Sequence, residues 1–120
     1  MSIYPVHQGN DPDLDPWGSL AGLGVEVLAG EPHAFGKVEY AHPDTGAKAG
    51  YFAVTQGEFR MTYPYDEHAV VIEGECILLN EATGESNSYH AGDAWFVRKG
   101  TSVRWTVMSS RFVKHYMSVA

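Results

Sequence analysis

The sequence is poor in cysteine and in basic residues, and it has no long apolar run. Cys76 is the single cysteine among 120 residues, so an internal disulfide or a multi-cysteine metal cluster cannot form. Lysine and arginine number 8 against 15 aspartates and glutamates, which gives a formal charge of −7. This balance argues against nucleic acids and anionic membrane surfaces as partners, because both attract clustered positive charge. No apolar run approaches the roughly 18 residues of a membrane span, and the N-terminus shows no secretion signal, so we expect a cytoplasmic domain.

Glycine and proline, by contrast, are frequent and divide the chain into short segments. Thirteen glycines and six prolines leave few stretches that could hold a helix. The acidic run DPDLDP and its prolines predict an N-terminal arm over residues 1–33, with a helical turn followed by a strand at 19–28. Beyond the arm, aromatic and β-branched residues predict strands at 38–41, 50–55, 58–63, 69–73, 75–79, 86–89, 94–97, 103–107 and 111–119.

Many short strands with turns every eight to twelve residues are typical of an antiparallel sandwich or a closed barrel. We therefore predict a single all-β domain, with the barrel over residues 34–120. The segment 69–72 is apolar on both sides, which predicts a strand covered on both faces. The outer cover would be either the N-terminal arm or another subunit.

Two stretches then show a family resemblance. Glu67-His-Ala-Val-Val-Ile-Glu-Gly74 and Gly92-Asp-Ala-Trp-Phe-Val-Arg-Lys-Gly100 resemble the two motifs of the cupin superfamily. With further matches between residues 50 and 119, the chain is similar to small cupins grouped with the ureidoglycine aminohydrolase cupin domain. The resemblance implies a jelly-roll β-barrel, and it implies a homodimer, because small cupins commonly pair.

The resemblance also implies where a metal would be held, by two histidines of an H-x-H pair, a glutamate and a later histidine. Glu67 matches the glutamate. Met61 and Tyr63 stand at the H-x-H positions with one spacing, and Arg60 and Thr62 stand there with the other. Val103 stands where the later histidine belongs, and Arg98 replaces a motif proline. We therefore predict no metal and no cofactor, a divalent transition metal being the alternative.

Glu67 is the leading candidate for a functional residue, as an acid or base inside the barrel. Burial would raise the pKa of such a carboxyl unless a cation or hydroxyl meets it, and Arg60, Lys114 and Tyr63 are the candidate partners. The predicted ligand pocket comprises Tyr51, Met61, Tyr63, Glu67, Trp95, Val103 and Trp105. If the other face of strand 58–63 points inward, the pocket would instead hold Arg60, Thr62 and Lys114.

The sequence leaves three functions open. The first is a metal-free cupin that binds a small, partly apolar molecule. The second is a metal-dependent enzyme of the ureidoglycine aminohydrolase type, acting on small polar metabolites. The third is a structural or interaction module. Which of them applies, and whether the protein is an enzyme, is not decided by the residues alone.

Overall fold

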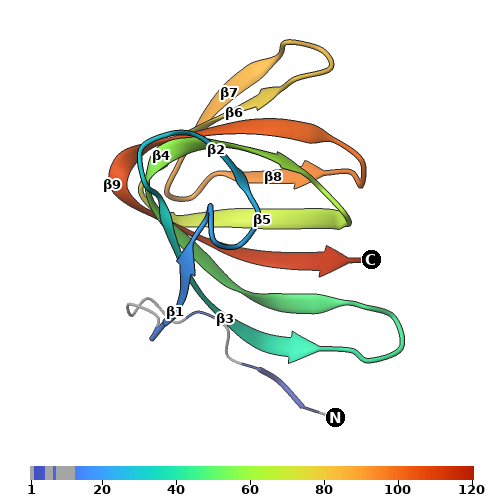
Figure 1. The fold of residues 1–120 in the computed structure, drawn as a ribbon. Coiled ribbons are helices and arrows are strands. Elements are labelled where there is room, and N and C mark those ends of the chain that lie inside the picture. Colours follow the sequence, from blue (N-terminus) through green and yellow to red (C-terminus); the bar gives the residue numbers. More distant parts are fainter. Residues whose placement is uncertain (1, 5–6, 8–12) are drawn as a thin grey trace.

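A computed structural model describes residues 2–4, 7 and 13–120, and these residues form nine strands and no helix (Figure 1). The strands are β1 (Asp15–Ser19), β2 (Glu26–Ala29), β3 (His33–Ala41), β4 (Lys48–Thr62), β5 (Asp66–Glu73), β6 (Glu75–Asn80), β7 (Ser86–His90), β8 (Ala94–Val97) and β9 (Ser102–Val119). Within the described ranges, no helix is long and apolar enough to cross a membrane. The cytoplasmic location stays a prediction.

Two long strands, β4 and β9, form the centre of the fold and pair with each other along most of their length. One half of this ribbon is flanked by β3 and β5, and the other half by β2 and β6. All pairings are antiparallel. In Figure 1 the two halves curl around a common interior, with the β6–β7 hairpin at one end. The predicted all-β jelly-roll barrel is confirmed.

An irregularity in the middle of the β4–β9 ribbon joins strands that the sequence predicts as separate. Thr55 pairs with Arg111 and Gly57 with Val107, so Gln56 and residues 108–110 lie between two regular stretches. Because one residue is inserted in β4, the side-chain alternation changes phase at this point. Even-numbered residues of β4 face the interior before the irregularity, and odd-numbered residues face it afterwards.

Aromatic side chains fill the interior on both sides of this phase change. Trp105 is the centre of the core at 1% exposure, and its ring stacks on Phe59 with a centroid distance of 5.4 Å. Phe112 and Trp95 meet it edge to face at 5.4 and 5.6 Å. Edge-to-face and offset arrangements are the favoured geometries of aromatic pairs. The core therefore holds rings from β4, β8 and both halves of β9.

The segment predicted as an arm contributes two strands to the chain's own sheets. β1 pairs with β3, and β2 pairs with β4 after the turn at residues 20–24. Leu14 and Ile72 pack against a cluster on the outer face of the β4–β9 ribbon. Ile72 therefore shares this outer cluster with Leu14 of the N-terminal region, while an outer cover over the whole segment 69–72 stays a prediction. Strands donated to a partner subunit stay a prediction, and residues 1, 5–6 and 8–12 of the predicted arm lie outside the described residues.

Candidate functional site

A buried ion pair lies inside the barrel. Lys114 Nζ on β9 donates to Glu67 Oε2 on β5 across 2.6 Å. Glu67 is 2% exposed and Lys114 is 4% exposed. Strand alternation turns the neighbouring His68 outward, where it is exposed. The carboxylate that matches the cupin glutamate therefore has an ammonium group of the same chain as its partner.

Aromatic rings enclose this ammonium group. The distances from Lys114 Nζ to the ring centroids are 5.1 Å for Trp105, 5.2 Å for Phe52, 5.5 Å for Trp95, 5.7 Å for Tyr116 and 6.0 Å for Tyr63. A cation within about 6 Å of a ring centroid is attracted by the negative face of the ring. We call these five rings, together with Glu67, the lysine cage. Its attraction offsets part of the cost of removing the ammonium group from water.

A cavity of about 90 Å³ opens beside the ion pair. It is lined by Trp17, Phe52, Phe59, Met61, Tyr65, Glu67, Trp105, Lys114 and Tyr116. Trp17, from β1, is 38% exposed and is the most open of these large apolar side chains. A Cβ atom at Gly36 would lie 2.1 Å from Cη2 of the Trp17 ring, so this position on β3 must lack a side chain for Trp17 to lie there.

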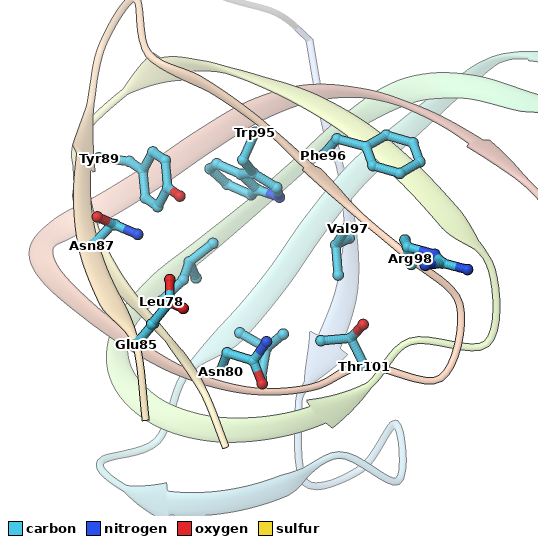
Figure 2. A pocket seen from close by; sticks show the side chains of 11 residues that line it. Leu78, Asn80, Glu85, Asn87, Tyr89, Trp95, Phe96, Val97, Arg98 and Thr101 are labelled. Carbon is cyan, nitrogen blue, oxygen red and sulfur yellow. The ribbon is translucent and has the colours of Figure 1, made fainter. Parts of the chain in front are cut away.

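A second cavity of about 320 Å³ lies between the β6–β7 hairpin and β8. Figure 2 shows its apolar floor of Leu78, Trp95 and Val97, with Glu85 and Arg98 at opposite sides. β7 pairs with β6, and β8 pairs with β5, so these two strands do not close the barrel here. Trp95 belongs to the walls of this cavity and to the lysine cage, so its ring contacts both the larger cavity and the ammonium group of Lys114.

The tyrosines around the ion pair are held in their neutral form. Burial raises the pKa of Tyr63 well above its ordinary value, and the charge of Glu67 adds to the effect. The same two causes, burial first, raise the pKa of Tyr65 to about 12 and raise the pKa of Tyr116. Near neutral pH these phenols are therefore uncharged around the Glu67–Lys114 ion pair.

These residues do not fit the metal site that the cupin resemblance implies. The positions of the H-x-H pair hold Met61 and Tyr63 on the inward face, and Val103 stands at the position of the later histidine. Glu67 already binds Lys114. The described part of the chain contains no group of three or more histidine, cysteine, aspartate or glutamate side chains that could hold a metal ion. One carboxylate, a thioether and a neutral phenol are a poor donor set for a first-row divalent ion.

Six of the seven predicted pocket residues border one of the two cavities or the ammonium group of Lys114. Met61, Glu67 and Trp105 line the smaller cavity. Tyr63 and Trp95 belong to the lysine cage, and Val103 and Trp95 line the larger cavity. The predicted pocket is therefore distributed over two spaces rather than one.

Tyr51 lies elsewhere, on the outer face of β4. It packs with Ala53 and Val113, and its ring meets His115 edge to face at 5.1 Å. His7 Nδ1 lies 2.8 Å from the Tyr51 hydroxyl oxygen. Simple alternation along β4 would place Tyr51 and Met61 on the same face. The irregularity at Gln56 reverses the alternation, so Tyr51 points outward and Met61 points inward.

The alternative set of Arg60, Thr62 and Lys114 is divided in the same way. Arg60 forms outward ion pairs with Glu26 and Glu81, and Thr62 shares a hydrogen bond with Ser102 over 2.8 Å. Only Lys114 points inward. Simple alternation along β9 would place Lys114 on the same face as Arg104, which points outward. Residues 108–110 lie between the two and reverse the alternation, so Lys114 points inward.

Five further residues of the smaller cavity are absent from the predicted site. They are Trp17, Phe52, Phe59, Tyr65 and Tyr116. Phe52 and Tyr116 lie beyond the phase changes of their strands, so alternation counted from strand 58–63 does not find them. Trp17 comes from the segment predicted as an arm. The one sequence signal for a role of Trp17 is its large aromatic side chain in a segment rich in polar residues.

Comparison with known proteins relates the chain to EutQ-like cupins. The EutQ-like cupin domain family matches residues 41–116. Acetate kinase EutQ of Escherichia coli K12 is 34% identical over 82 residues, which are 67% of this chain and 34% of that protein. Acetate kinase EutQ of Salmonella typhimurium LT2 is 35% identical over 86 residues, or 69% and 37% of the two chains. The chain thus spans about a third of the length of these relatives.

Solved structures show the same fold at lower identity. The Clostridium difficile EutQ protein has a TM-score of 0.63 and 20% identity, covering 73% of this chain and 68% of its own. A Pseudomonas syringae protein of unknown function has a TM-score of 0.77 and 21% identity, covering 89% and 44%. The family match and both sequence relatives are EutQ-like, and the expected likeness to the ureidoglycine aminohydrolase cupins is not shown. The barrel and the family match together identify the chain as a member of the EutQ-like cupin domain family.

Proposed function

We propose that this protein is a small-molecule-binding cupin whose ligand lies in the cavity beside Glu67 and Lys114, without the metal of the wider superfamily. The observation that supports this proposal is the buried ion pair at the wall of an otherwise aromatic cavity. Ligand sites in proteins typically combine apolar walls with a few convergent polar groups. Charged side chains are seldom buried without a partner or a role, and here both charges border open space.

The larger cavity in Figure 2 is the other place where a ligand could lie. Its polar lining residues include Asn80, Glu85, Asn87, Arg98 and Thr101, and Glu85, Asn87 and Arg98 are exposed. They do not converge on a buried point as Glu67 and Lys114 do. We therefore assign the ligand to the smaller cavity, and the larger one becomes the alternative location.

Matched variants test this assignment. Met61→Phe fills the smaller cavity, and Leu78→Phe fills the larger one. A thermal-shift screen of small amides, carboxylates and ureides should find ligands that raise the melting temperature of the wild type and of Leu78→Phe, but not of Met61→Phe. A ligand lost only in Leu78→Phe would place the site in the larger cavity and refute the assignment.

The enzymatic alternative requires metal ligands at positions that hold other residues here. Elemental analysis of the purified protein is the direct test, and we expect less than about one-tenth of an equivalent of transition metal per chain. A stoichiometric ion bound inside the barrel would favour the enzymatic alternative over a metal-free binding protein.

A further inference from the structure

The cavity has a balanced charge. Among the residues that line it, only Glu67 and Lys114 are charged, and they neutralise each other over 2.6 Å. The remaining walls are six aromatic rings and Met61. A charged ligand would therefore bring an uncompensated third charge into a site with few other polar groups. Removing an ion from water into such surroundings is strongly unfavourable unless an opposite charge is free to meet it.

The ion pair nevertheless leaves hydrogen-bonding capacity on both sides. The ammonium group of Lys114 has three N–H donors, and within the described chain only Glu67 Oε2 accepts from it. The second oxygen of Glu67, Oε1, receives no hydrogen bond from the described residues. A ligand that accepts one hydrogen bond and donates another would satisfy both groups. A carboxylate can accept but not donate, and an alkylammonium ion can donate but not accept.

The volume restricts the ligand to a few heavy atoms. The cavity of about 90 Å³ is smaller than the roughly 150 Å³ cavity that accommodates benzene in another protein. Phe52, Phe59 and Trp105 provide apolar walls for a short alkyl group. A compact polar end and a short apolar end therefore match the two sides of the space.

Building on the proposed function, we infer that this site selects small uncharged molecules that both donate and accept hydrogen bonds, with short primary carboxamides as the representative class. The carbonyl oxygen accepts from Lys114 Nζ, and the amide nitrogen donates to Glu67 Oε1. The alkyl group contacts the aromatic walls. Binding of the amide makes and breaks no covalent bond.

Three probes with the same carbon skeleton test this inference: propionamide, propionate and propylammonium. Each is titrated into the protein at pH 7, and binding is measured from NMR shifts of the tryptophan indole N–H signals. We expect propionamide to bind at least tenfold more tightly than either ion. Glu67→Gln leaves Lys114 without its counter-charge and should shift the preference to propionate. Lys114→Met leaves Glu67 alone and should shift the preference to propylammonium.

The control variant is Glu58→Gln, which removes the same charge from a partly exposed pair with Arg104 outside the cavity. It should keep the wild-type preference. The Gln variant at position 67 preserves side-chain shape, so it keeps the experiment informative if Lys114→Met fails to fold. Equal or tighter binding of an ion by the wild type would overturn the inference while leaving the binding site intact. Binding of none of the probes at 50 mM, or shifts that do not involve Trp105, would reject the proposed site as well.

Discussion

Replacing the buried ion pair one residue at a time should destabilise the protein far more than replacing both residues together. Lys114→Met leaves a carboxylate at 2% exposure without a partner, and Glu67→Leu leaves the ammonium group alone. Removing one member of a buried pair typically costs about 3–5 kcal/mol, whereas replacing both members by apolar groups is often neutral. A chain of 120 residues has a total stability of about 6–18 kcal/mol, at roughly 0.05–0.15 kcal/mol per residue. Each single change therefore removes a large share of it.

The measurement is urea unfolding followed by circular dichroism, with the free energy of unfolding compared between wild type, both single variants and the double variant. The double variant should lie within about 1–2 kcal/mol of wild type, the difference including the lost attraction between Lys114 and its rings. The control pair Glu58 and Arg104 is partly exposed, so breaking it should cost less than about 1 kcal/mol. Our reasoning would be refuted by single variants that cost as little as this control, or by a double variant whose loss equals the sum of the two single losses.

Four other measurements follow from the structure. Gly36→Ala should displace the indole that lies over it and cost about 1–3 kcal/mol by overpacking, with a changed tryptophan emission; an unchanged spectrum and stability would contradict the contact. Cys76 is buried, and burial raises the pKa of its thiol to about 12, so a thiol reagent at pH 8 should modify it only after the protein unfolds. Fast modification of the folded protein would count against the burial of Cys76. Burial lowers the pKa of His115 below 6.5, so the unfolded chain binds the proton at a higher pH than the folded chain does, and the free energy of unfolding should fall as the pH drops through 6.5. His115→Gln should make this pH dependence less steep. An unchanged pH dependence in the variant would exclude His115 as its cause. Sedimentation at micromolar concentration should show a dimer, because apolar side chains such as Phe96 remain exposed, and a monomeric mass would reject this expectation.

The sequence predicts the barrel well because the turns and the strand composition are local signals. It also identifies Glu67 correctly as an inward residue of β5, since strand β5 is regular from Asp66 to Val71. The sequence does not predict which residues of β4 and β9 point inward along their full length. Gln56 and residues 108–110 lie between the paired stretches and reverse the alternation. The sequence marks both places as breaks between strands, at TQG and MSS, but it does not show that the sheet continues beyond them with the opposite face inward. Alternation alone therefore places Tyr51 in the interior and groups Lys114 with Arg60 and Thr62, which point outward. The sequence does predict Lys114 as a candidate partner of Glu67, and the ion pair agrees with this.

The contribution of the early strands could not be predicted for a different reason. Trp17 reaches the cavity only because β1 pairs with β3, a contact between segments distant from the motifs. Composition around DPDLDP indicates an extended segment but not the sheet that receives it. Long-range pairing of this kind depends on tertiary packing, whereas strand propensity is set locally.

Trp17 lies on a strand that precedes residues 41–116, the part of the chain shared with the EutQ-like family. A fragment trimmed to those shared residues would retain Glu67 and Lys114 but would lose one wall of their cavity and the strand that carries it. Relatives with the same barrel and a different leading segment could thus keep the charged pair while admitting molecules of another size. In such a set of proteins, the segment that precedes the barrel would determine which ligands fit, while the barrel itself stays the same.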